Sequence, residues 1–272
     1  MQRNLLPPIR TPIGSAVWQI IARLLCVALL LCSVAAQAEP GKRVRTLPAG
    51  WPWDTIPHIA DGDSWTTTVI LVNLEDTAAK YKLDLFGDDG KAKAFNIVGR
   101  GAVSSVSGQI PVRGSVTLTT TGTATSLNQG WAILDNVETD DVGVMAIFRQ
   151  QVAGRPAYEA TVTASTGIDT DSIVPFDNTG GFVTALALLN PSSFSTTSIP
   201  VEILDEAGNR IATDIVRLNA GNKIAFTTAD RWPGTAGRRG TIQLADGLYS
   251  VAVLGFRFSP TGAFTTLAVM DR

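Results

Sequence analysis

The sequence predicts an all-β protein with two tandem antiparallel immunoglobulin-like β-sandwich domains that come from an internal duplication. From Ile56 onward, short runs rich in Val, Ile, Leu, Thr and Phe alternate with Gly, Asn, Asp and Pro, a pattern typical of antiparallel strands. No window after the first forty residues has the apolar spacing of an amphipathic helix. Segments of the first half also recur in the second half in the same order, and a repeat sets the size and number of the folding units.

The repeat is visible in three pairs of segments that share an alternation of apolar and polar residues. They are Tyr81–Phe86 with Ile199–Leu204, Ser115–Thr120 with Lys223–Thr228, and Ile147–Arg149 with Gly255–Arg257. This alignment predicts that Leu83 corresponds to Val201, and Phe148 to Phe256. Seven strands in each half match the strand count of an immunoglobulin-like sandwich.

We expect strands wherever the alternation is uninterrupted. In the first half they are Thr66–Asn73, Lys80–Phe86, Ser104–Ile110, Ser115–Thr120, Gly130–Asn136, Val142–Val152 and Ala157–Thr163. In the second half they are Phe182–Asn190, Thr197–Leu204, Arg210–Leu218, Lys223–Thr228, Gly240–Ala245, Tyr249–Ser259 and Ala263–Val269. The run Ala185–Leu189 is apolar on both faces, which predicts a central strand or one covered by the other domain.

Residues 1–38 have the features of an export signal. Three arginines precede an apolar run from Leu24 to Ala35, and Ala36-Gln37-Ala38 resembles a cleavage site. The run is too short for the roughly 20 residues of a spanning helix. We expect cleavage after Ala38 and a secreted or periplasmic protein with no membrane span; an uncleaved N-terminal anchor is the alternative.

The rest of the chain divides into a leader at 39–55, a first sandwich at 56–163, a linker at 164–173 and a second sandwich at 174–272. Both cysteines lie in the export segment, so disulfides do not stabilise the exported chain. Without the three signal arginines, 19 basic residues remain against 24 acidic ones, a net charge of −5. That charge, without a basic cluster, argues against nucleic-acid binding.

Three segments carry a resemblance to a known group of proteins: Ile56–Gly62, Leu85–Gly90 and Pro260–Phe264. They resemble segments of uncharacterised exported bacterial proteins with tandem Ig-like β-sandwich domains. The resemblance spans the chain from Ile56 to the C-terminus. It implies a fold and an exported location, and it brings no catalytic residues with it.

The residue types needed for common catalytic sites are scarce. After the export segment the chain has no cysteine and one histidine, His58, so it cannot form a Cys/His zinc site. A Ser-His-Asp triad would have to use His58, and no Gly-x-Ser-x-Gly motif accompanies it. Pairs of acidic residues occur in turns and linkers, where water-facing carboxylates are expected. We therefore expect no enzymatic activity.

Two kinds of binding residue remain as candidates. Acidic residues near the domain junction are candidate calcium ligands, although no EF-hand spacing is present and no cofactor is required. They are Asp169, Asp171 and Asp177. Exposed tryptophans are candidates for stacking on a ligand, whereas Trp65 and Trp131 fit core positions. The candidates are Trp51, Trp53 and Trp232.

The sequence thus predicts an exported, non-catalytic binding or structural module at the cell surface, in the periplasm or in the medium. Its expected partners are protein or polysaccharide surface ligands. The alternative is a carbohydrate-binding or polysaccharide-active accessory protein, which would need coplanar exposed tryptophans on a concave face. A flat face covered by Thr and Ser favours an adhesion or scaffold role. A long uncharged edge strand would indicate an assembly subunit.

Overall fold

The computed structural model describes residues 54–135, 142–165, 171–245 and 251–271, all of which belong to one compact unit. The predicted export signal at 1–38, most of the leader and part of the linker lie outside the described residues. Within the described part the protein is all-β, as predicted, with short helices only at α2 (Thr228–Arg231) and η1 (Pro233–Thr235).

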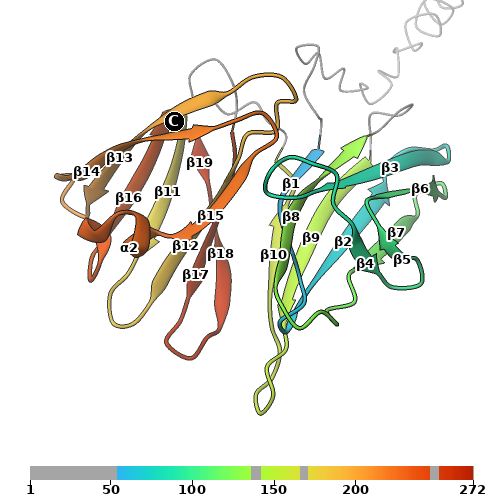
Figure 1. Ribbon diagram of the computed structural model, residues 1–272, viewed down its shortest axis with the longest axis horizontal. Coiled ribbons are helices and arrows are strands. Elements are labelled where there is room, and N and C mark those ends of the chain that lie inside the picture. The colour runs from blue at the N-terminus through green and yellow to red at the C-terminus, as the bar shows by residue number, and fades with distance from the viewer. Residues whose placement is uncertain (1–53, 136–141, 166–170, 246–250, 272) are drawn as a thin grey trace, which may run out of the picture. The chain divides into compact units, whose positions relative to one another are not determined.

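The first half contains two four-stranded antiparallel sheets that enclose a hydrophobic core (Figure 1). One sheet has the order β1 (Asp54–Asp61), β8 (Asn128–Asp135), β3 (Ala79–Phe86) and β6 (Ser105–Ile110). The other has the order β10 (Tyr158–Thr163), β9 (Val142–Gln150), β2 (Trp65–Asn73) and β7 (Ser115–Thr119). A small ribbon of β4 (Phe95–Ile97) and β5 (Gly101–Val103) lies between β3 and β6 in the chain.

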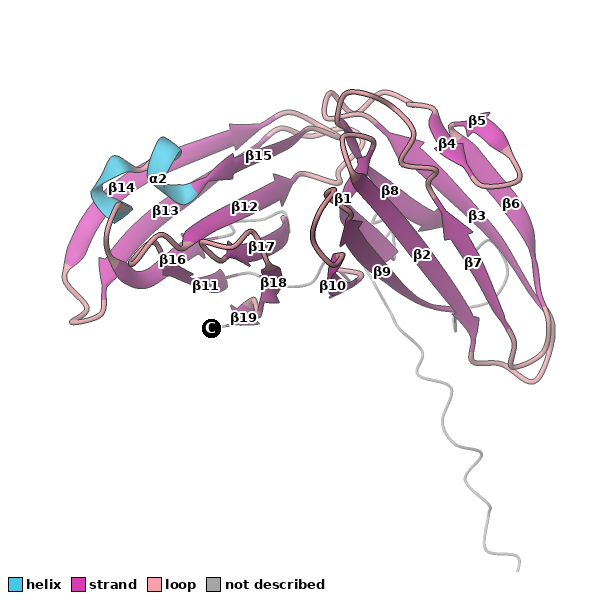
Figure 2. Cartoon of the chain, turned by 90° about the horizontal axis from the view of Figure 1, so that it is seen from below, coloured by secondary structure: helices cyan, strands magenta, loops and turns pink. Residues whose placement is uncertain are grey.

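The second half has two sheets with a corresponding strand order (Figure 2). The first is β14 (Arg210–Leu218), β13 (Thr197–Asp205), β16 (Arg239–Ala245), β11 (Asp171–Asp177) and the short β19 (Met270–Asp271). The second is β15 (Lys223–Thr227), β12 (Val183–Leu189), β17 (Ala252–Phe258) and β18 (Phe264–Leu267). Apart from β19, the long strands of the two halves follow the same order.

The strand order is not that of an immunoglobulin domain. In a constant-type immunoglobulin domain, the first strand lies in the same sheet as the second. Here the first strands, β1 and β11, pair with β8 and β16, whereas the second strands, β2 and β12, belong to the opposite sheets. The prediction of two β-sandwiches holds, and the immunoglobulin strand order is not found.

Most expected strands are present with ends that differ by a few residues. The short strands β4, β5 and β19 were missed, and so were two longer strands, β1 and β11. Each has a proline in its middle, Pro57 or Pro175, and a proline inside a sequence segment argues against a central strand because its nitrogen cannot donate a hydrogen bond. β1 is at the edge of its sheet, and β11 pairs with β19 only at Ser172 and Ile173. Both prolines are therefore tolerated. Because β11 starts at Asp171, the end of the expected linker belongs to the second sandwich.

Two buried threonines with the same hydrogen bonds show which residues of the two halves occupy equivalent positions. The Thr67 hydroxyl donates to the carbonyl of Ala60 and accepts from its amide, at 2.8 and 3.0 Å. Thr184 makes the same pair of bonds with Asp177, at 3.1 and 2.9 Å. Thr67 and Thr184 therefore occupy equivalent positions in β2 and β12.

The predicted correspondence of Phe148 with Phe256 is wrong by one residue. Thr67 pairs across the sheet with Phe148, whereas Thr184 pairs with Arg257. Since side chains alternate between the two faces of a strand, a shift of one residue moves each side chain to the other face. Phe148 consequently points into the first sandwich, and Phe256 points away from the interior of the second.

Candidate functional site

The hydrophobic core of the first sandwich extends onto the second. Ala187, Leu254 and Phe264, on the outer face of the sheet β15-β12-β17-β18, are at most 7% exposed and belong to the same buried cluster as the first-half core. Edge strand β1 is buried along almost its whole length, and β10 lies beside β18. The second sandwich therefore covers the side of the first sandwich between its edge strands β1 and β10. This interface is the candidate site.

Aromatic rings occupy the middle of the interface. Phe148 and Phe256 pack edge to face, with ring centroids 5.4 Å apart and an interplanar angle of 89°. Trp65, at the start of β2, lies against Phe264, with centroids 5.0 Å apart. Such pairs add about 0.5–1.5 kcal/mol beyond the burial of their area. The rings therefore hold the two sandwiches in a specific orientation.

One end of the interface depends on two glycines. Gly90, in the turn after β3, and Gly221, in the turn before β15, have positive φ of 76° and 69°. A Cβ atom at Gly90 would lie 2.9 Å from the backbone of Gly221, so only glycine allows this approach. Beside them, the Lys223 amide donates to the carbonyl of Asp88 at 2.9 Å.

At the other end, Arg155 joins the loop after β9 to the turn before β18. Its guanidinium donates to the carbonyl of Thr261 at 2.9 Å and to the side chain of Gln150 at 2.7 Å. The same group lies 4.6 Å from the ring centroid of Tyr158. Polar contacts thus fix both ends of an interface whose centre is apolar.

His58, Lys223 and Asp88 form a polar chain between the halves. The Lys223 ammonium lies 2.8 Å from His58 Nδ1 and 3.0 Å from Asp88 Oδ1. The Lys223 side chain is fully buried, whereas that of Asp88 is 46% exposed. Because an ammonium group only donates, Nδ1 accepts and the neutral imidazole carries its proton on Nε2.

The surroundings of His58 favour the neutral form of its imidazole. Burial and the neighbouring charge of Lys223 both lower the pKa of His58 well below its usual value. Burial also lowers the pKa of Lys223, against the opposing effect of Asp88. A general base activating a serine would need that hydroxyl on its ring, but the hydrogen bond that His58 makes among the described residues is to Lys223. The contacts of His58 and Lys223 therefore link the two sandwiches.

The tryptophan candidates are only partly placed. Trp51 and Trp53 lie outside the described residues. Trp232 is 5% exposed, so the prediction that it is available for stacking is wrong. Its indole nitrogen donates to Asp214 Oδ2 at 3.0 Å, and its ring packs edge to face on Phe226. The helix α2 ends at this position and turns the indole into the second sandwich, a tertiary effect that the local sequence does not reveal.

The calcium candidates are not brought together. Asp169 lies outside the described residues, and Asp171 and Asp177 lie at opposite ends of β11, separated by about 20 Å at the usual rise of a strand. Asp177 binds Arg257 at 2.6 Å and Arg239 at 3.0 Å, which neutralises its charge. Across the described ranges, no group of three or more His, Cys, Asp or Glu could hold a metal ion.

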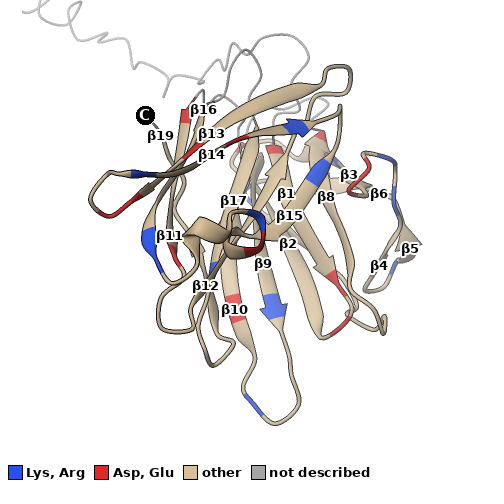
Figure 3. Cartoon of the chain, turned by 60° about the vertical axis from the view of Figure 1, so that its left-hand side comes forward, with Lys and Arg blue, Asp and Glu red and all other residues tan. Residues whose placement is uncertain are grey.

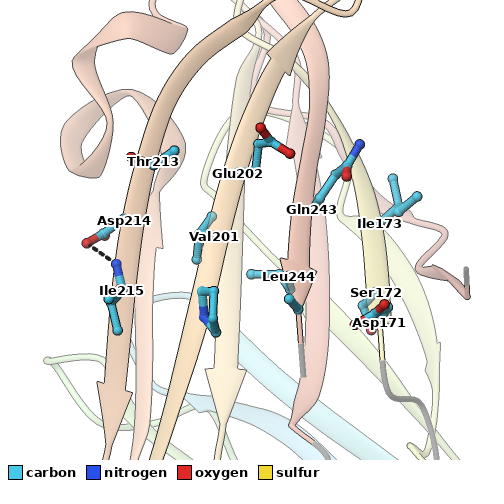
Figure 4. Close-up of a pocket in the computed structure, with 12 residues that line it drawn as sticks. Asp171, Ser172, Ile173, Val201, Glu202, Thr213, Asp214, Ile215, Gln243 and Leu244 are labelled. Atoms are coloured by element: carbon cyan, nitrogen blue, oxygen red, sulfur yellow. Dashed lines mark hydrogen bonds between the residues drawn. The ribbon is translucent and has the colours of Figure 1, made fainter. Parts of the chain in front are cut away.

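A hollow of about 630 Å³ lies on the outer face of the sheet that contains β13 and β16 (Figure 4). Glu202 and Gln243 project into it beside the apolar side chain of Ile173 (Figure 4). Glu202 is paired with Arg210 at 2.6 Å, and no aromatic ring lines the hollow. It offers neither a pair of free carboxylates for glycosidic hydrolysis nor a stacking platform for a sugar.

The sheet β10-β9-β2-β7 has few charged residues (Figure 3), and many of the side chains on its outer face carry hydroxyl groups. Its outward residues with hydroxyl groups are Thr66, Thr68, Ser115, Thr117, Thr119, Thr161 and Thr163. Between them the same face presents the apolar side chains of Ile70, Val72, Met145 and Ile147, and the ion pair of Arg149 with Glu159 lies at one end. The hydroxyls of Thr68 and Thr119 lie 3.1 Å apart across neighbouring strands. We refer to this mixed surface of hydroxyl and apolar side chains as the hydroxyl face.

The described part of the chain has no helix that is both long and apolar enough to cross a membrane. Comparisons of the chain with protein-family models, curated proteins and solved structures gave no significant match.

Proposed function

We propose that this chain is an exported, non-catalytic binding or structural protein whose two sandwiches, derived from an internal duplication, act as one rigid body. The observation that carries the proposal is the shared core. Ala187, Leu254 and Phe264 of the second half are buried in the cluster of the first half. Separation of the sandwiches would expose this apolar area at a cost of about 25 cal/mol per Å². Two sandwiches that do not move relative to each other can hold one binding surface in a constant shape for a partner.

The charged groups support a non-catalytic role. Asp177 and Asp214 are both held by arginines, and hydrogen bonds to each outweigh the effect of burial and lower its pKa. Catalytic acids instead need a raised pKa in a cleft. His58 is engaged with Lys223.

The hydroxyl face is the surface we propose for binding. Its threonines are β-branched, so they have few side-chain rotamers to lose when a partner binds. The uncharged hydroxyl and apolar side chains suit an extended partner, such as another protein strand or a cell-envelope polymer. Carbohydrate stacking is less well supported, because Trp131 and Trp232 are buried and Trp65 packs on Phe264.

The test is retention on purified cell envelopes. Wild-type residues 39–272 are compared with Thr117→Lys/Thr161→Lys, which places two charges on the hydroxyl face, and with Ser198→Lys/Thr213→Lys on the second half as a matched control. We expect retention of wild type and control, and at least a tenfold loss for the first variant. Equal retention of all three would exclude this face, and hydrolysis of an envelope polymer would exclude a non-catalytic role.

A further inference from the structure

A cavity of about 210 Å³ lies within the interface and is partly open to solvent. Four aromatic rings line it, those of Trp65, Phe148, Phe256 and Phe258. Both sandwiches contribute to this wall. The hydroxyl face plays no part in it, so the cavity is independent of the surface proposed above.

Small side chains keep the cavity open. Ala187 and Ala225 lie directly opposite each other on the neighbouring strands β12 and β15, and Ala185 lies two residues from Ala187 on the same face of β12. A larger residue at Ala185 or Ala225 would fill the space. Ala185 is only half-buried because its methyl group borders the cavity. An apolar cavity of about 150 Å³ stays dry and binds benzene, so this one can accept about eight non-hydrogen atoms.

Two polar side chains reach this otherwise apolar wall, His58 and Gln129. Since His58 Nδ1 accepts from Lys223, its Nε2–H is a donor, and no described residue accepts a hydrogen bond from it. His58 is half-buried although it lies deep in the interface, which is the exposure expected for a ring that borders a cavity. Gln129 can supply a carbonyl oxygen as an acceptor. A hydroxyl group satisfies both, since it accepts and donates.

We propose that this cavity binds a small neutral aromatic alcohol. The four rings suit an aromatic ring in edge or offset packing, and the volume limits the ligand to a single ring with a short substituent. A charged ligand is disfavoured, because burial of a charge in an apolar wall is costly and the Lys223 ammonium is already paired with Asp88.

The test uses benzyl alcohol and ethylbenzene, two probes of equal size that differ in a hydroxyl and a methyl group. His58 is the sole histidine, so its imidazole gives one assignable set of NMR signals in the full exported chain. We expect both probes to shift the His58 Cε1–H signal saturably through ring currents. Only benzyl alcohol should also shift the Nε2 signal, through a new hydrogen bond.

Ala185→Leu should fill the cavity and lower the affinity for both probes at least tenfold. Ala153→Leu, in an exposed loop, should leave both affinities within twofold of wild type. Circular dichroism checks that both variants fold; if Ala185→Leu does not, Ala225→Leu replaces it. The proposal is overturned if neither probe gives a saturable shift at His58. It is equally overturned if cavity filling leaves the affinities unchanged, or if the two probes shift Nε2 alike.

Discussion

Phe148 of the first sandwich and Phe256 of the second pack edge to face, with centroids 5.4 Å apart. Phe148 is 1% exposed and points into its own sandwich. Phe256 lies one residue before the position in β17 that is equivalent to Phe148 in β9. Its side chain therefore points out of its own sandwich, towards the other. The contact therefore joins the interior of one half to the exterior of the other.

Loss of the Phe256 ring should destabilise the whole chain. We expect Phe256→Ala to lower the free energy of unfolding by about 2–4 kcal/mol, since it leaves a cavity among the interface rings. Phe194→Ala is the matched control, because Phe194 is 72% exposed and its loss should cost less than about 0.5 kcal/mol. Urea denaturation followed by circular dichroism gives both values. Similar values for the two variants would show that the interface rings do not stabilise the protein.

The strand register is tested within each half. Leu83 and Val201 are 1% and 3% exposed, so Leu83→Ala and Val201→Ala should each cost about 2–4 kcal/mol. Lys82, next to Leu83, faces outward and pairs with Asp84 at 2.6 Å, and its replacement by alanine should cost less than about 1 kcal/mol. Thermal unfolding measures all three. A cost at Lys82 as large as that at Leu83 would contradict the inward placement of Leu83.

Protonation of His58 should make the stability of the protein decrease as the pH is lowered. Its pKa is lowered by burial and by Lys223, so below about pH 6.5 the unfolded chain binds a proton that the folded chain does not. The free energy of unfolding therefore falls as the pH drops from about 6.5, by up to about 1.4 kcal/mol per unit. The lowered pKa of Asp177 and of other carboxyls acts only below about pH 5.

Denaturation at pH 7.0, 6.5, 6.0, 5.5 and 5.0 measures this slope, and His58→Gln, which keeps an acceptor for Lys223, is the control. We expect the slope between pH 6.5 and 5.0 to disappear in the variant. A slope that persists in His58→Gln would assign the effect to other groups.

Buried and exposed ion pairs should contribute different amounts to the stability of the protein. Asp177, with a side chain 14% exposed, holds both Arg257 and Arg239, so Asp177→Ala leaves two guanidinium groups without their partner. We expect a loss of about 1–3 kcal/mol. Glu202→Ala removes the exposed partner of Arg210 and should cost less than about 1 kcal/mol. Equal losses in chemical denaturation would contradict the structural role assigned to Asp177.

The sequence predicts those parts of the fold that depend on local alternation. Arg210–Leu218 is a strand with the predicted bounds, because its alternation is uninterrupted. β1 and β11 were missed because proline argues against a strand unless its edge position is known. The two-sided apolar run Ala185–Leu189 did indicate cover by the other sandwich, which Ala187 confirms.

The candidate site was less predictable than the fold. Lys223 begins a strand and would be read as solvent-facing, yet its side chain is fully buried against His58, which is distant in the sequence. Burial of Trp232 likewise depends on its bond to Asp214. Both contacts depend on packing between distant segments, which periodicity does not report.

The most direct test of the shared core is native-state hydrogen exchange in Leu254→Ala. Leu254 belongs to the second sandwich but is buried in the core of the first. If the two sandwiches unfold as one body, a loss of roughly 3 kcal/mol should lower the protection of the slowest amides by about a hundredfold. The account predicts the same reduction in β2 and β9 of the first half as in β12 of the second. A reduction confined to the second half would contradict it.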